Sequence, residues 1–265
     1  EPPPEFFQEL KRLAAESLPG THRYMENAGY AETRAAVAAQ LSLETGLKFT
    51  LNNIVMTCGA AGGMNVVLKT ILEEGDEVIV LAPYFVEYLT YVDNHGGTAR
   101  VVPTSERFLP DLERLEEALG ERTKAVILNT PNNPTGVVYD EGVLAALGEL
   151  LRRREEELGR PIYLLSDEPY RRIVYDGAVF PAPACHHRNT VVAYSHSKDL
   201  ALPGERIGYL AVHPECTGRE ELLAGMVYSN RILGFVNAPA LMQHLVRSLG
   251  EATVSVADYQ RKRDF

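Results

Sequence analysis

A single lysine in this sequence is flanked by residue types that bind phosphate. Lys198 follows Ser195 and Ser197, and Arg206 and Gly208 come a few positions later. A lysine amine can attack a carbonyl carbon and form a Schiff base. Serine hydroxyls and a bidentate guanidinium suit a phosphate dianion. The spacing therefore indicates a Schiff-base lysine beside a phosphate site, although a solvated loop would use the same residue types.

A buried strand is needed to hold this lysine in place. Residues 190–194 are β-branched, aromatic and apolar, which predicts a strand that delivers Ser195, Ser197 and Lys198 at its carboxyl end. Residues 207–212 predict the next strand. We expect Lys198 to be desolvated inside the core, because desolvation favours the neutral, nucleophilic amine.

Two acidic residues follow another apolar segment. Residues 161–165 predict a strand, and Asp167, Glu168 and Tyr170 come directly after it. A carboxylate that follows a buried apolar strand is costly unless it is paired. We therefore expect a partner for this carboxylate, with a solvated turn as the alternative.

A turn of small residues begins a predicted helix. Gly59, Ala60 and Ala61 follow a predicted strand over residues 54–57 and open a helix that continues to residue 72. Small side chains expose backbone N–H groups at a helix N-terminus, where an anion is stabilised. The spacing matches neither a dinucleotide-binding fingerprint nor a Walker loop. Close packing of a helix on a strand would require the same small residues.

An aromatic and an amide stand at two further strand ends. Phe85 follows a predicted strand over residues 77–81, and it either stacks on a planar ligand or belongs to the core. Asn133 lies in a proline-containing turn that follows a strand over residues 123–128. The prolines fix φ in this turn and so display the amide side chains.

The remaining segments alternate between the two kinds of pattern. Helices are predicted over residues 5–18, 31–41, 86–94, 109–119, 140–151, 217–229 and 238–249, and a further strand over residues 98–102. This alternation predicts an α/β fold. Ligands of such folds bind beyond the carboxyl ends of the strands, so the candidate residues should meet there. A phosphate cradle, a stacking ring, an acid and a lysine are what pyridoxal phosphate needs.

Composition excludes several other classes of protein. The 265 residues are 45% hydrophobic, and their formal net charge of -10 disfavours nucleic acid or an anionic membrane as a partner. Cys58, Cys185 and Cys216 lie far apart, which indicates a reducing, cytoplasmic location and no zinc site. The adjacent His186 and His187 are interpreted as surface-loop residues, so no metal is proposed. The run of arginines and glutamates over residues 152–157 is interpreted as a solvated helix face, and no apolar run has membrane-spanning length.

Taken jointly, three motifs resemble those of the fold-type I pyridoxal-phosphate aminotransferases of class I/II, which include the aspartate aminotransferases. They are Asn133-Pro134-Thr135-Gly136, Asp167-Glu168-Pro169-Tyr170, and Ser195-His196-Ser197-Lys198 with Arg206 and Gly208. The resemblance covers almost the whole chain. It implies a three-layer α/β/α fold with a mainly parallel sheet, in which residues 23–240 form the large cofactor-binding domain. Residues 1–22 and 241–265 would be parts of a small domain that is largely missing.

The resemblance also implies roles around the cofactor ring. Lys198 would bind pyridoxal phosphate as a Schiff base and move the substrate proton, and Asp167 would keep the pyridine nitrogen protonated. Asn133 and Tyr170 would donate hydrogen bonds to the phenolic oxygen of the ring. Phe85 would stack on the ring, at a position where family members commonly carry a bulkier or hydroxylated aromatic residue.

The same resemblance assigns the phosphate ligands and a partner. The residues implied to hold the phosphate are Gly59, Ala60, Ala61, Ser195, Ser197 and Arg206. Tyr24 is similar to the tyrosine that reaches the phosphate of the partner subunit, which implies a homodimer. The family's C-terminal arginine, which grips the substrate carboxylate, has no counterpart before Phe265. Arg231 is a candidate substitute, although a structural role at a helix end explains it equally, and residues 1–265 alone are expected to bind the cofactor but to transaminate poorly.

Three functions agree with these residues. The first is transfer of an amino group between an α-amino acid and a 2-oxo acid. The second is a carbon–sulfur β-lyase or a decarboxylase on the same cofactor, which product analysis separates from the first, since only a β-lyase releases ammonia and pyruvate. The third is a cofactor-binding domain without turnover, which a half-transamination assay detects.

Overall fold

The computed structural model describes residues 1–16 and 19–265, and these residues form one sheet. Its strands are β1 (Ile54–Thr57), β2 (Glu77–Ala82), β3 (Thr98–Pro103), β4 (Thr123–Asn129), β5 (Tyr163–Asp167), β6 (Thr190–Ser195) and β7 (Gly208–Val212). The α-helices are α1 (Pro4–Glu16), α2 (Ala31–Thr45), α3 (Gly59–Ile71), α4 (Glu87–Asp93), α5 (Leu112–Ala118), α6 (Glu141–Leu158), α7 (His196–Asp199), α8 (Arg219–Ile232), α9 (Ala240–Leu249) and α10 (Val256–Asp264). Two short 3₁₀ helices are η1 (Leu51–Asn53) and η2 (Pro183–Cys185).

The strand order of the sheet is β1-β7-β6-β5-β4-β2-β3. Strand β7 runs antiparallel to both of its neighbours, and every other pair of adjacent strands is parallel. The central strands are continuous apolar runs, as expected for a sheet that is covered on both faces. It follows that all the strands except β7 end at the same edge of the sheet.

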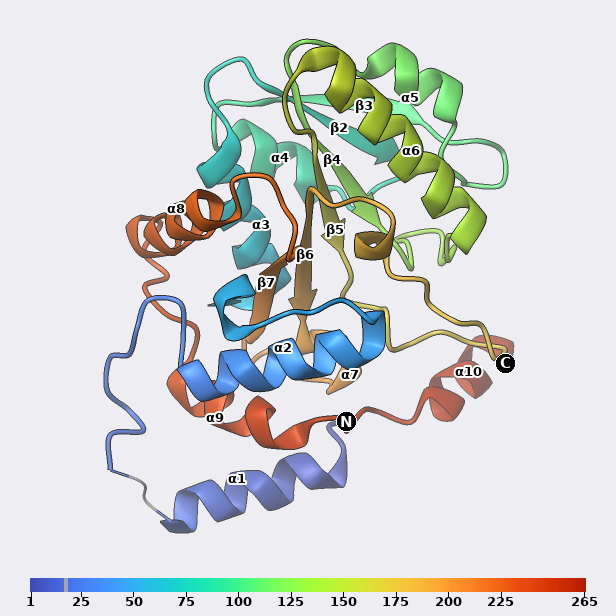
Figure 1. Ribbon diagram of the computed structural model, residues 1–265. Helices are drawn as coiled ribbons and strands as arrows, with labels where there is room; N and C mark the ends of the chain where they lie inside the picture. Colours follow the sequence, from blue (N-terminus) through green and yellow to red (C-terminus); the bar gives the residue numbers. More distant parts are fainter. Residues whose placement is uncertain (17–18) are drawn as a thin grey trace.

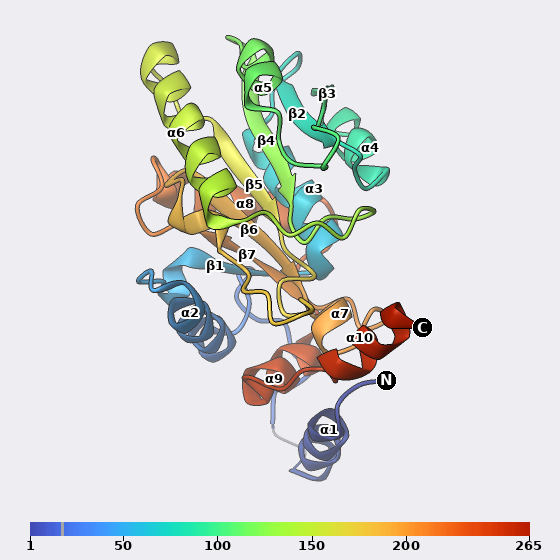
Figure 2. The same ribbon diagram turned by 90° about the vertical axis from the view of Figure 1, so that its right-hand side faces the viewer.

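Helices cover the sheet on both sides. Helices α3, α4 and α8 pack their apolar side chains against one face, and α2, α5 and α6 cover the other. Figures 1 and 2 show the sheet between these two helical layers. The predicted three-layer α/β/α fold with a mainly parallel sheet is confirmed.

The two ends of the chain lie together. Phe6 and Leu13 of α1 share a hydrophobic cluster with Leu245 of α9, and Figure 1 shows the two helices side by side. The expected boundary between residues 240 and 241 lies at the start of α9, whose side chains also pack on α2. The division into domains at residues 1–22, 23–240 and 241–265 stays a prediction.

Most predicted elements lie where the sequence pattern places them. The helix predicted from residue 109 begins only at Leu112, because the Asp111 side chain accepts a hydrogen bond of 3.2 Å from the Arg114 backbone N–H and caps it there. The predicted helix over residues 5–18 is confirmed to Glu16, and its last residues, Ser17 and Leu18, lie outside the described residues.

Two interpretations of polar residues are wrong. Glu155 belongs to the charged run of α6 but is buried, because it faces the sheet and accepts hydrogen bonds from the Ile162 backbone N–H at 2.8 Å and from the Asn189 side chain at 2.6 Å. His187 is also buried, with Nε2 at 2.9 Å from the Ile162 carbonyl oxygen and 3.4 Å from Glu155. Both residues stabilise the amino end of β5, which neither charge patterning nor residue adjacency revealed.

Over residues 1–16 and 19–265, none of the helices combines the length and apolarity that a membrane span requires. The described residues also contain no group of three or more histidine, cysteine and acidic side chains that could hold a metal ion.

Candidate active site

A cavity of about 270 Å³ opens at the edge where the strands end. Its lining includes Ala60 after β1, Phe85 after β2, Asp167 at the end of β5 and Ser195 at the end of β6. Arg206 precedes β7 rather than following a strand. Because β7 runs in the opposite direction, its amino end lies at this same edge, and Arg206 therefore joins the other groups.

The structure brings together most of the residues that the sequence singled out. Those that line the cavity are Ala60, Ala61, Phe85, Asn133, Asp167, Tyr170, Ser195, Ser197, Lys198 and Arg206. Gly59 lies just behind this lining, where a Cβ atom would stand 2.8 Å from Nη2 of Arg206, so a side chain there would push against the guanidinium. Tyr24 is 90% exposed and does not line the cavity.

Several lining residues were missed by sequence reasoning. They are Met64, Tyr88, Tyr91, Asn129, Pro169 and Pro203. Tyr88 was detectable, because it lies in the first turn of the helix predicted over residues 86–94, which begins directly after Phe85. Its ring packs edge-on against Phe85 with centroids 5.6 Å apart.

Asp167 is a buried carboxylate beside the cavity. Its Oδ2 accepts a 2.5 Å hydrogen bond from the Tyr88 hydroxyl, while Oδ1 has no hydrogen-bond partner among the described residues. Burial raises the pKa of Asp167 to about 6, the Tyr88 hydrogen bond opposes this rise, and the charge of Glu168 adds to it. The expected partner of the Asp167 carboxylate is therefore confirmed for Oδ2. Oδ1 remains free to accept a hydrogen bond from a ligand.

Glu168 points into a different environment from Asp167. It accepts hydrogen bonds from the Ser166 hydroxyl at 2.7 Å and from Arg171 at 3.3 Å, and it does not line the cavity. Of the two adjacent acids, only Asp167 is available to a molecule bound in this cavity.

We predict that Tyr88→Phe raises the pKa of Asp167 further. The variant removes the only hydrogen bond that stabilises this carboxylate among the described residues, and hydrogen bonds to a charged group contribute about 1.5–3 kcal/mol. The midpoint of the Asp167 carboxyl signal in a pH titration by NMR measures the change. Tyr91→Phe is the matched control, since Tyr91 also lines the cavity but donates its hydroxyl to Glu87. Equal midpoints in wild type and Tyr88→Phe would contradict the assigned contact.

Lys198 does not lie inside the core, contrary to expectation. It belongs to the single-turn helix α7 that follows β6, and its side chain is exposed to the cavity. Its Nζ lies 5.6 Å from the centroid of the Tyr170 ring, and it forms no ion pair with any described residue. The reason is that β6 ends at Ser195, so Lys198 stands one helical turn beyond the sheet, where the cavity is open.

Hydroxyls and a guanidinium gather at one end of the cavity. The Ser195 and Ser197 hydroxyls lie 2.6 Å apart, and the Ser197 backbone N–H donates to Ser195 Oγ. Arg206 donates from Nη1 to the Pro203 carbonyl oxygen at 2.9 Å and is not paired with any carboxylate among the described residues. An unpaired arginine beside two hydroxyls can bind a phosphate dianion with charge-assisted hydrogen bonds.

The turn after β4 is held against Asp167. The Asn129 side chain donates to the Asp167 carbonyl oxygen at 2.9 Å and accepts from the Asn133 backbone N–H at 2.7 Å. These two bonds leave the Asn133 side chain on the cavity wall beside Tyr170. Arg231, at the end of α8, does not line the cavity. Its Nη1 lies 3.3 Å from Asn27 Oδ1.

Comparison with known proteins identifies the family of this chain. The family model described as aminotransferase class I and II matches residues 1–265. The chain belongs to this family. Aminotransferases of class I and II use pyridoxal phosphate as their cofactor.

Individual aminotransferases show how far the similarity extends. A probable aspartate/prephenate aminotransferase from Thermus aquaticus is 41% identical over 208 residues, which are 78% of this chain and 52% of that protein. The aspartate/prephenate aminotransferase of Thermus thermophilus is 38% identical over the same shares of the two chains. This chain thus spans about half the length of these two curated relatives.

Solved structures of aminotransferases have the same fold. A crystal structure of an aminotransferase from Eubacterium rectale matches with a TM-score of 0.97 and 39% identity, covering 99% of this chain and 67% of that one. The aspartate aminotransferase of Thermus thermophilus with maleate matches with a TM-score of 0.85 and 31% identity, covering 99% of this chain and 65% of that one.

The residues of the cavity fit the family's cofactor. Asp167 Oδ1 is buried without a partner and can accept a hydrogen bond from a protonated ring nitrogen. Arg206 is free of carboxylates and can pair with a phosphate, and Phe85 offers an aromatic face. The same lining contains Lys198, which supplies a primary amine for the aldehyde carbon.

Proposed function

We propose that this chain forms the cofactor-binding part of an aminotransferase that moves an amino group between an α-amino acid and a 2-oxo acid. The observation that carries the proposal is the placement of Lys198, Arg206 and the unpartnered Oδ1 of Asp167 on one cavity. Aspartate is the first amino donor to test, because the Thermus relatives are named aspartate/prephenate aminotransferases.

The mechanism begins with binding. Arg206, Ser195 and Ser197 would hold the phosphate, together with the backbone N–H groups of Ala60 and Ala61 at the start of α3. Phe85 would stack on the ring, and Asn133 and Tyr170 would donate hydrogen bonds to the ring's phenolic oxygen.

Proton movement depends on two further residues. Asp167, held by Tyr88, would keep a proton on the ring nitrogen by presenting its free Oδ1. When bound, pyridoxal phosphate supplies a conjugated, positively charged ring that accepts the electron pair of the substrate Cα–H bond. The amine of Lys198 would take the proton from the substrate Cα and deliver it to the former aldehyde carbon of the cofactor, two bonds away across the nitrogen, which is general acid–base catalysis.

We further propose that the protein forms a homodimer and is located in the cytoplasm. Tyr24 is 90% exposed, which suits a side chain that reaches the phosphate site of a partner subunit. The cysteines Cys58, Cys185 and Cys216 are free of disulfides, which supports a reducing compartment such as the cytoplasm.

A half-reaction tests the proposed function. The protein is loaded with pyridoxal phosphate and mixed with aspartate, glutamate and a panel of other amino acids without a 2-oxo acid. We expect one equivalent of 2-oxo acid and conversion of the bound cofactor to pyridoxamine phosphate, formed slowly because residues 1–265 alone are expected to transaminate poorly. Release of ammonia and pyruvate would show a β-lyase instead, and cofactor binding without any product would show a domain without turnover.

A further inference from the structure

We propose that Asp199 is a positioning residue that fixes the place of the Lys198 amine through the backbone of helix α7. The inference rests on the proposed role of Lys198 as the residue that bonds to the cofactor. Asp199 does not line the cavity and has no exposed side-chain surface, so it acts through its neighbour rather than on a bound molecule.

Helix α7 cannot hold its own geometry. It spans only His196–Asp199, a single turn, and a single turn fixes many dihedral angles for few hydrogen bonds. The Ser195 side chain caps it by accepting from the Ser197 backbone N–H at 3.1 Å. Lys198 adds no support of its own, because it makes no ion pair with any described residue. Other groups must therefore hold this turn in place.

The Asp199 side chain ties α7 to its surroundings. Its Oδ2 accepts a 2.7 Å hydrogen bond from the Tyr194 hydroxyl on β6, lies 3.1 Å from His196 Nδ1 and is 3.8 Å from Arg172 Nη1. Burial alone would raise the pKa of Asp199, but His196, Tyr194 and Arg172 outweigh it and hold the pKa below its usual value. The carboxylate is therefore charged and anchored at neutral pH.

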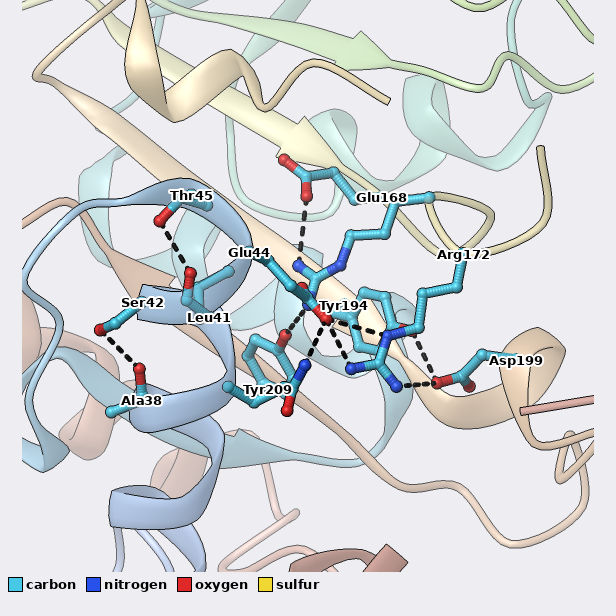
Figure 3. A network of polar contacts seen from close by, with 12 residues as sticks. Ala38, Leu41, Ser42, Glu44, Thr45, Glu168, Arg172, Tyr194, Asp199 and Tyr209 are labelled. Carbon is cyan, nitrogen blue, oxygen red and sulfur yellow. Dashed lines mark hydrogen bonds and ion pairs between the residues drawn. The ribbon is translucent and has the colours of Figure 1, made fainter. Parts of the chain in front are cut away.

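The Asp199 carboxylate belongs to a larger network of charged side chains (Figure 3). Figure 3 shows Arg172 between Asp199 and Glu44 of α2, and Arg172 Nη2 lies 2.6 Å from the Glu44 carboxylate. Glu44 also pairs with Arg171 at 2.7 Å, and Arg171 pairs with Glu168 next to Asp167. The segment that carries the catalytic acid and the helix that carries the lysine are thus joined through one set of charges, in which Arg171, Glu168 and Asp199 are buried and Glu44 is exposed.

The backbone of Asp199 makes a second connection. Its carbonyl oxygen accepts hydrogen bonds from the Val254 N–H at 2.7 Å and from the Thr253 hydroxyl at 3.0 Å. Residues 253 and 254 link α9 to α10. Helix α7 is therefore held from the β5 and β6 side by the Asp199 side chain and from the C-terminal segment by its carbonyl group.

Two ligands separate positioning of Lys198 from general damage to the site. Pyridoxal phosphate condenses with a lysine amine, so that the lysine nitrogen replaces the aldehyde oxygen and water leaves. Pyridoxamine phosphate has the same ring and phosphate but carries an amine, and it cannot bond to lysine. A shift of the Lys198 amine should weaken the first ligand only, because a displacement of about 1 Å can cost about a hundredfold in a bond-forming step.

The experiment measures the dissociation constants of both ligands for wild type, Asp199→Ala and Asp199→Asn. We expect Asp199→Ala to weaken pyridoxal phosphate at least about tenfold and pyridoxamine phosphate less than about twofold. Asp199→Asn should recover part of the loss, because the amide oxygen still accepts from Tyr194. It also provides the measurement if Asp199→Ala does not fold.

Glu155→Ala is the matched control. Glu155 is likewise a buried carboxylate with several hydrogen-bond partners, but it lies on α6 outside the cavity lining. Equal weakening of both ligands in the Asp199 variants, or a selective loss of pyridoxal phosphate in Glu155→Ala, would overturn the positioning role. The proposed function fails separately, if wild type and Lys198→Ala bind pyridoxal phosphate with the same affinity.

Discussion

Asp167→Asn is expected to stabilise the ligand-free protein at neutral pH while it removes most of the catalytic activity. Burial raises the pKa of Asp167 from 3.8 to about 6, so the folded chain keeps a proton that the unfolded chain has lost between these pH values. The free energy of unfolding therefore falls as the pH rises from about 4 to about 6. A shift of about two pH units corresponds to about 3 kcal/mol, and asparagine, which does not titrate, avoids this loss.

Urea unfolding of the ligand-free protein between about pH 4 and pH 8 measures this effect. Relative to Asp167→Asn, wild type should lose stability across the window. Glu155→Gln is the control of opposite sign: although burial opposes it, hydrogen bonds from His187, Ile162 and Asn189 lower the pKa of Glu155, so its removal should destabilise the chain at neutral pH. Parallel pH profiles for wild type and Asp167→Asn would show that burial does not raise the pKa of Asp167.

The same variant should fail in catalysis. Asparagine cannot balance a positive charge on the ring nitrogen, and loss of one preorganised electrostatic partner costs about 3 kcal/mol, or roughly a hundredfold in rate or more. The ratio of the half-reaction rates of wild type and Asp167→Asn at saturating pyridoxal phosphate measures this loss. Near-normal turnover with bound cofactor would contradict the role of Asp167. A residue that lowers the stability of the ligand-free protein but is needed for catalysis with bound cofactor is typical of a functional position.

Lys198→Ala is expected to abolish covalent attachment of the cofactor and to slow the half-reaction by about 10²–10⁴-fold or more. Lys198 is the lysine among the residues that line the cavity, so no other amine lies ready to replace it there. Borohydride reduction followed by peptide mass spectrometry should find pyridoxal phosphate fixed to Lys198 in wild type and to no residue in the variant. Lys124→Ala, whose amine pairs with Asp76 at 3.5 Å, is the control. An adduct of comparable yield in Lys198→Ala would show that the cofactor bonds to another lysine.

Much of the fold followed from local pattern. Continuous apolar runs such as residues 123–128 and 190–194 predicted buried strands, and their alternation with helical spacing predicted the α/β class. The rule that ligands bind beyond the carboxyl ends of strands then predicted that Phe85, Asp167 and Lys198 lie close together. These inferences worked because side-chain periodicity and the position of a residue relative to a strand are properties of the sequence itself.

The environment of each side chain was decided only by the tertiary structure. Tyr88 is far from Asp167 in the sequence, and the contact forms because β2 and β5 lie on either side of β4. Arg206 reaches the cavity only because β7 reverses direction. Lys198 is exposed and Glu155 is buried, against both expectations, since burial depends on what packs opposite a residue. Composition and spacing name the chemical groups of a site, whereas their charge, partners and access to a ligand depend on neighbours that the chain supplies from a distance.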